Sequence, residues 1–172
     1  MINTLKAIGP LMYRGAECVL AALLGIMFTA FIVQIVFRYL LNFPMGWTSE
    51  LTVITWLWLV LWGAAFVVRE SEEIRFDLVY GAVSHRVRRA MAVITGVMLI
   101  ILYGYSLPAT VDYVAFMKVE STAYLKIRLD YLYSIYVIFA VAVIARYGWI
   151  VWRALRGKDT GEFDPTQASS GV

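Results

Sequence analysis

The chain has 172 residues, a formal net charge of +3, and a composition that is 62% hydrophobic and 16% charged. Soluble domains are about 45–50% apolar and about 25% charged, so this composition places the protein in the membrane class. A single cysteine excludes an internal disulfide and a thiolate metal cluster, and a single histidine excludes a bis-histidine haem within one chain. The basic excess suits anionic lipid headgroups better than nucleic acid.

Four apolar runs predict an all-α integral membrane protein with four transmembrane helices. About 20 apolar residues cross the roughly 30 Å hydrocarbon core of a bilayer. The first run is longer than the core of a signal peptide, so we expect it to remain as an anchor helix. We expect residues 1–152 to form one transmembrane domain and the polar residues 153–172 to form a disordered cytoplasmic tail. The predicted spans are residues 18–37, 51–68, 90–111 and 131–152.

The charges between the runs predict the orientation of the chain. Eleven Lys and Arg residues lie on the side of the two termini and the 69–89 loop, and four lie on the other side. Positive charges collect on the cytoplasmic side of membrane proteins, so we expect both termini to be cytoplasmic. The turn at 38–50 and the mixed loop at 112–130 then face outward. Within the 69–89 loop, apolar residues on one side of 74–84 predict an amphipathic helix on the membrane surface.

The turn between the first two runs contains the only charges between Cys18 and Val68, which are Arg38 and Glu50. We predict that these two side chains approach each other and that Trp47 anchors the turn at the membrane interface. Pro44 is expected to shape the turn. The alternative is that Glu50 presents its charge to a docking partner.

Two features inside the runs predict helix packing. Trp58 and Trp62 lie one turn apart on the same face of the second run. Large rings there either contact lipid or form a rigid surface for another protein's helices. Since they have no evident internal task, we predict that they pack on a larger membrane partner. Gly96 and Gly104 of the third run allow close helix contact.

The residues offer no constellation for catalysis or for cofactor binding. No Asp, Glu, Lys, Arg or His lies in the middle of any run, although secondary transporters and proton pumps usually need such groups there. His85 has no second ligand at metal spacing. The carboxylates of the 69–89 loop lie among five arginines, which favours a salt-bridged surface over an acid–base pair. We therefore expect no enzyme activity, metal or cofactor.

A series of residues between positions 37 and 80 matches a known family pattern. The series comprises Phe37-Arg38-Tyr39, Pro44, Trp47, Glu50, Trp58, Gly63-Ala64 and Ile74-Arg75-Phe76-Asp77-Leu78. In order and spacing it resembles the small membrane subunit of TRAP transporters, the DctQ-like family. The length and the four predicted spans agree with that family. The partner-interface or structural positions nominated here are Arg38, Tyr39, Pro44, Trp47, Glu50, Trp58, Trp62, Gly63, Arg75 and Asp77.

The resemblance implies an accessory role in secondary active transport. TRAP systems import organic acids across the bacterial inner membrane, driven by a sodium or proton gradient. A periplasmic binding protein delivers the substrate to a large membrane subunit, and the small subunit braces the large one and helps to dock the binding protein. Three alternatives remain: a membrane anchor of a redox enzyme, an independent homo-oligomeric transporter, and the small subunit of a tripartite tricarboxylate transporter.

Overall fold

The computed structural model describes residues 2–43, 45–68 and 85–156, and the side chains of these residues except 2–12, 85 and 88. The amphipathic helix expected at 74–84 lies outside the described residues, as do Pro44, Arg75, Asp77 and most of the expected tail.

All regular secondary structure in the described ranges is helical. Four long α-helices are extended by two short π-helices and one 3₁₀ turn, and Ser121 and Arg128 form one isolated β-bridge in the loop before the last helix. The elements are α1 (Ile2–Ile35), η1 (Val36–Leu40), α2 (Gly46–Trp62), η2 (Gly63–Val67), α4 (His85–Phe116), η4 (Met117–Val119) and α5 (Leu129–Leu155).

Within the described ranges, four helical segments are long and apolar enough to cross a membrane, in agreement with the four expected spans. A helix suits this environment because it satisfies its own backbone hydrogen bonds where no water is available. The segments are Tyr13–Leu40, Gly46–Val67, Arg89–Val119 and Leu129–Leu155, with 28, 22, 31 and 27 residues.

The helices extend beyond the apolar runs at several ends. The second helix begins at Gly46 rather than at 51, so Glu50 lies inside it. The third reaches Phe116 and the fourth begins at Leu129, which shortens the loop expected at 112–130 to residues 120–128. Charged and aromatic side chains can prolong a helix into the headgroup region, where their polar ends reach water. Hydrophobicity alone therefore marks the membrane core and not the helix ends.

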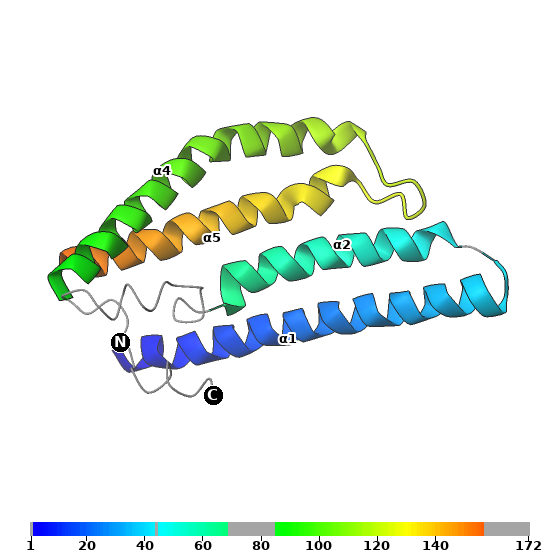
Figure 1. Cartoon of the computed structure of the whole chain (residues 1–172), viewed down its shortest axis with the longest axis horizontal. Helices are drawn as coiled ribbons and strands as arrows, with labels where there is room; N and C mark the ends of the chain where they lie inside the picture. The colour runs from blue at the N-terminus through cyan, green and yellow to red at the C-terminus, as the bar shows by residue number, and fades with distance from the viewer. Residues whose placement is uncertain (1, 44, 69–84, 157–172) are drawn as a thin grey trace. The chain divides into compact units, whose positions relative to one another are not determined.

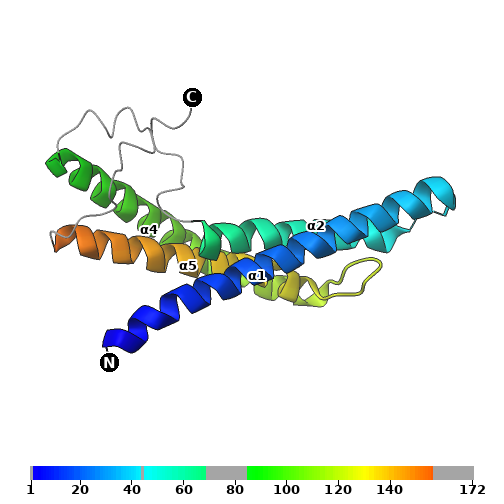
Figure 2. The same ribbon diagram turned by 90° about the horizontal axis from the view of Figure 1, so that it is seen from below.

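The chain divides into two compact units. The first contains Met1–Val67 and Pro108–Phe139. Within it, α1 and α2 run side by side as an antiparallel hairpin (Figures 1 and 2). Its buried residues include Ala16, Ala30, Thr48, Thr55 and Ile135. Small side chains at such positions let membrane helices approach closely.

The second unit contains Val68–Leu107 and Ala140–Val172, and in its described part α4 approaches α5 at Gly96. A Cβ atom added to Gly96 would lie 2.6 Å from Cγ2 of Val151 and 3.8 Å from the ring of Tyr147. The glycine therefore permits this approach, as the sequence predicts. At Gly104 a Cβ meets no atom within 4 Å, so this glycine makes no close contact in the described part of the chain, and the prediction for it stays open to a partner's helix.

Candidate functional site

Glu50 fastens the 120–128 loop to α2. Its Oε2 atom accepts hydrogen bonds from the backbone N–H groups of Leu125 at 2.7 Å and Tyr124 at 3.2 Å. The Oε1 atom lies 3.5 Å from the same Tyr124 nitrogen. Hydrogen bonds to a charged acceptor are about twice as strong as neutral ones. The carboxylate thus holds two successive amides of a loop that is more than 70 residues away in sequence.

The loop is also ordered by its own contacts. The backbone N–H of Thr122 donates to the Ile127 carbonyl at 2.9 Å, and the Ile127 N–H donates to Oγ1 of Thr122 at 3.0 Å. Thr122 is buried, and Lys126 turns the chain with a φ of 55°. Arg128 donates to the Asp130 carboxylate, which raises the pKa of the arginine. These contacts make the 120–128 loop a compact hairpin-like cap.

Gly46 provides the second contact between this loop and α2. The ring of Tyr124 lies so close to Gly46 that a Cβ atom at this position would overlap it. Only a glycine lets the ring take this place at the start of the helix. Tyr124 as a whole is nevertheless 65% exposed, so the contact covers only part of its surface.

The predicted pair of Arg38 and Glu50 is wrong for the described residues, where no ion pair joins them. The loop amides occupy the carboxylate instead. Arg38 lies in the π-helix η1, is exposed, and has its guanidinium 5.9 Å from the ring centroid of neighbouring Tyr39. The physical reason is proximity: the loop returns to α2 and offers two backbone donors, so that only the Glu50 side chain has to be ordered and not a second long side chain.

Trp58 and Trp62 have internal partners, which corrects the premise that they lack a task in the chain. The indole N–H of Trp58 donates to the carbonyl of Leu132 in α5 at 3.1 Å. That of Trp62 donates to the carbonyl of Ala16 in α1 at 3.3 Å. Both residues are half-buried. The tryptophan of α2 with the most exposed side chain is Trp56, at 55%.

The remaining predicted positions divide by exposure. Tyr39 is 74% exposed. Trp47 lies at the surface, and its indole N–H donates to Sδ of Met45 at 2.8 Å. Gly63 is buried at the junction of α2 and η2, where an added Cβ would lie 3.2 Å from Cδ1 of Leu20.

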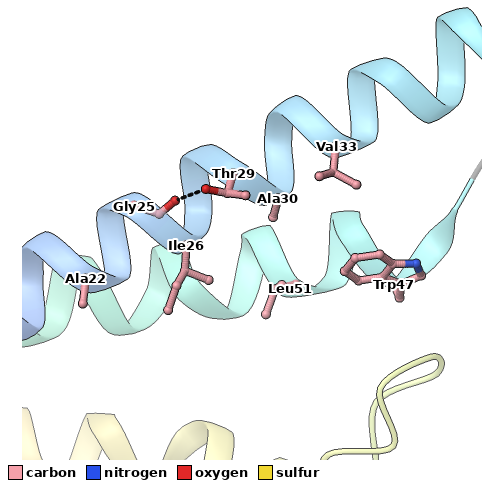
Figure 3. A pocket seen from close by; sticks show the side chains of 8 residues that line it. All are labelled: Ala22, Gly25, Ile26, Thr29, Ala30, Val33, Trp47 and Leu51. Atoms are coloured by element: carbon pink, nitrogen blue, oxygen red, sulfur yellow. Dashed lines mark hydrogen bonds between the residues drawn. The ribbon is translucent and has the colours of Figure 1, made fainter.

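An apolar groove opens between α1 and α2 (Figure 3). It has a volume of about 440 Å³ and is lined by α1 residues between Ala22 and Val33 and by Trp47 and Leu51 of α2. A second hollow, of about 460 Å³, lies among Tyr113 of α4 and Tyr133 and Tyr136 of α5. The ring of Tyr133 is in tilted contact with the other two, at centroid distances of 6.2 Å to Tyr113 and 6.0 Å to Tyr136.

Among the described residues, no group of three or more His, Cys, Asp or Glu side chains could hold a metal ion. The polar groups of Glu50, Trp58 and Trp62 join α2 to the 120–128 loop, to α5 and to α1. The described residues thus define a helical protein with four helices long and apolar enough to cross a membrane.

A comparison of the sequence with known protein families identifies the family of this protein. The profile described as "Tripartite ATP-independent periplasmic transporters, DctQ component" matches residues 16–157. The chain belongs to this family, and it is accordingly a small membrane component of a TRAP transporter. A search of curated proteins found no match.

Proposed function

We propose that the chain is the accessory membrane subunit that braces the large subunit of a TRAP transporter importing an organic acid. Its family match over residues 16–157 is the observation that carries this proposal. In the proposal, a periplasmic binding protein delivers the carboxylate and an ion gradient drives its entry through the large subunit. The chain lies in the bacterial inner membrane with both termini in the cytoplasm.

The chemistry of the spans supports a bracing role. The middle of each apolar run lacks the ionisable groups on which substrate and ion pathways usually depend. The polar groups near the ends hold helices together: Glu50 fixes the 120–128 loop, and Trp58 and Trp62 tie α2 to α5 and α1. A subunit built in this way offers a stiff surface to a partner.

The proposed roles of the nominated residues follow from their exposure. Glu50, Trp58, Trp62 and Gly63 act inside the chain as braces. Tyr39 has most of its surface free for a partner. Arg38 and Trp47 serve as anchors at the membrane interface, and Pro44, Arg75 and Asp77 keep their proposed structural or partner-interface roles.

The test is uptake by proteoliposomes that contain the large subunit, with and without this chain, in the presence of the binding protein. We expect substrate uptake under an imposed sodium or proton gradient only when both membrane subunits are present, and co-purification of the large subunit with the tagged chain. Uptake by this chain alone would overturn the proposal in favour of an independent transporter. Haem absorbance in the purified chain would instead indicate a redox anchor.

A further inference from the structure

The residues that line the groove between α1 and α2 have no side-chain hydrogen-bonding group without a partner in the chain. The hydroxyl of Thr29 donates to the carbonyl of Gly25 at 2.8 Å, as the dashed line in Figure 3 shows. The indole N–H of Trp47, at one end of the groove, donates to Met45 Sδ. Since both polar side chains of the lining are satisfied within the chain, the groove favours an apolar occupant.

The size of the groove favours a thin occupant. Along α1 it extends from Ala22 to Val33, a rise of about 16 Å at 1.5 Å per residue. That length equals about half of the 30 Å hydrocarbon core, which is the layer filled by the acyl chains of one leaflet. A helix of this length and about 10 Å in diameter would fill more than about 1,000 Å³. The groove holds about 440 Å³, a volume that suits a single extended chain better than a whole helix.

A cation lies beyond the same end of the groove. Arg38 follows Val33 by five residues, about 7 Å further along the axis and toward the turn from which Trp47 comes. Arg38 is exposed, and no carboxylate pairs with it among the described residues. Glu50, the nearest acidic residue in sequence toward α2, is held by the 120–128 loop. Guanidinium groups bind phosphate strongly, through paired N–H donors.

We propose that the α1–α2 groove holds one acyl chain of a membrane phospholipid whose phosphate is bound by Arg38. The apolar lining suits the acyl chain of such a molecule, and the exposed guanidinium of Arg38, five residues beyond the groove on the same helical segment, suits its phosphate. Trp47 closes the groove at the level of the interface, where tryptophan is enriched in membrane proteins. This lipid site is independent of which transporter the chain serves.

The experiment is native mass spectrometry of the full chain in mild detergent, titrated with phosphatidylglycerol carrying palmitoyl and oleoyl chains. Gly25→Leu places a side chain in the groove, and a Cβ at Gly25 meets no atom of the chain within 4 Å. We expect one phospholipid to bind the wild-type chain and binding to fall by about tenfold or more in this variant. The matched control is Gly15→Leu on the same helix. A Cβ at Gly15 also meets nothing within 4 Å, and Gly15 does not line the groove. It should bind as the wild type does.

Arg38→Gln tests the headgroup contact separately. We expect binding about fivefold weaker, since one arginine contributes about 1 kcal/mol at an anionic membrane surface. Unchanged lipid binding in Gly25→Leu overturns the proposal. If that variant keeps its lipid but loses co-purification with the large subunit, the groove is a protein interface instead. A loss in Gly25→Leu equal to that in Gly15→Leu also overturns it, because the effect then does not belong to the groove.

Discussion

The carboxylate of Glu50 determines the local structure at the start of α2. Two backbone N–H groups of the 120–128 loop reach it from a distant part of the chain, at 2.7 and 3.2 Å. Such amides would otherwise need water or another acceptor at the membrane surface. The same side chain therefore satisfies the loop and positions it over Gly46, where the Tyr124 ring packs.

This arrangement predicts that Glu50→Ala loosens the 120–128 loop and leaves the helices intact. Each hydrogen bond to a charged group contributes about 1.5–3 kcal/mol, so the Tyr124 and Leu125 amides should exchange their hydrogens roughly tenfold to hundredfold faster. Glu50→Gln keeps one acceptor oxygen, so its amide exchange rates should lie between those of the wild type and those of Glu50→Ala. The measurement is hydrogen–deuterium exchange followed by mass spectrometry of the loop peptide. Glu120→Ala, an exposed carboxylate in the same loop, is the control and should exchange as the wild type does. Unchanged exchange in Glu50→Ala would refute the anchoring role.

The sequence indicates that Glu50 is important, but it predicts Arg38 as its partner instead of the loop amides. The charges of Arg38 and Glu50 are visible in the sequence, so the sequence predicts an ion pair between them. The actual donors are backbone amides, which every residue has and which leave no mark in the sequence. Only the fold brings Tyr124 and Leu125 to the carboxylate. Contacts of this kind become predictable once the loop length and the helix ends are known.

At the scale of whole helices, α2 is joined to its neighbours through two indole N–H groups. Trp58 reaches the carbonyl of Leu132 in α5, and Trp62 reaches that of Ala16 in α1. The sequence places both rings on one side of the helix by their spacing. It does not show that they turn toward the chain's own helices, because lipid, partner and intramolecular surfaces are equally apolar.

We predict that Trp58→Phe and Trp62→Phe each destabilise the protein slightly. A hydrogen bond between membrane helices contributes about 0.6 kcal/mol, which lowers the midpoint of thermal unfolding by about 2 °C for a chain of this size. In the double variant, the midpoint of thermal unfolding should fall about twice as far as in either single variant. Trp56→Phe, at an exposed position of the same helix, should leave the midpoint unchanged. Thermal unfolding of the purified chain in detergent gives the comparison, and equal shifts in all three single variants would contradict it.

The contact of Gly96 in α4 with Val151 in α5 predicts a larger change in stability. Gly96→Ala places a methyl group 2.6 Å from Val151 Cγ2, and overpacking of this kind costs about 1–3 kcal/mol. The midpoint of thermal unfolding should fall by about 3–10 °C. Gly104→Ala meets open space and should be neutral or slightly stabilising, because alanine is the better helix former. Val151→Ala combined with Gly96→Ala removes the clashing methyl and should recover most of the loss. If Val151→Ala does not restore stability to the Gly96→Ala variant, the loss does not come from the contact between these two residues.

For the whole molecule, composition and run length predict the number and type of helices, because the bilayer permits few alternatives. A segment of about 20 apolar residues must satisfy its backbone internally, so the four runs become four helices. The ends of the helices and their packing partners depend on tertiary contacts. The 120–128 loop illustrates this, since α4 and α5 extend into a stretch that the sequence assigned to a mixed loop.

The last prediction concerns the orientation of the whole chain in the membrane. Eleven of the fifteen basic residues lie on the side of the termini, and positive charge resists transfer to the outer side. The 120–128 loop should therefore face outward and the residues beyond α5 inward. Single cysteines test this in a Cys18→Ser background, because Cys18 is free and exposed. Glu120→Cys should react with a membrane-impermeant maleimide in intact spheroplasts, whereas Ser169→Cys should react only after permeabilisation. The reverse pattern would show that the C-terminal segment is external and the 120–128 loop internal. Reaction of both sites in intact spheroplasts would mean that the chain does not cross the membrane an odd number of times between them.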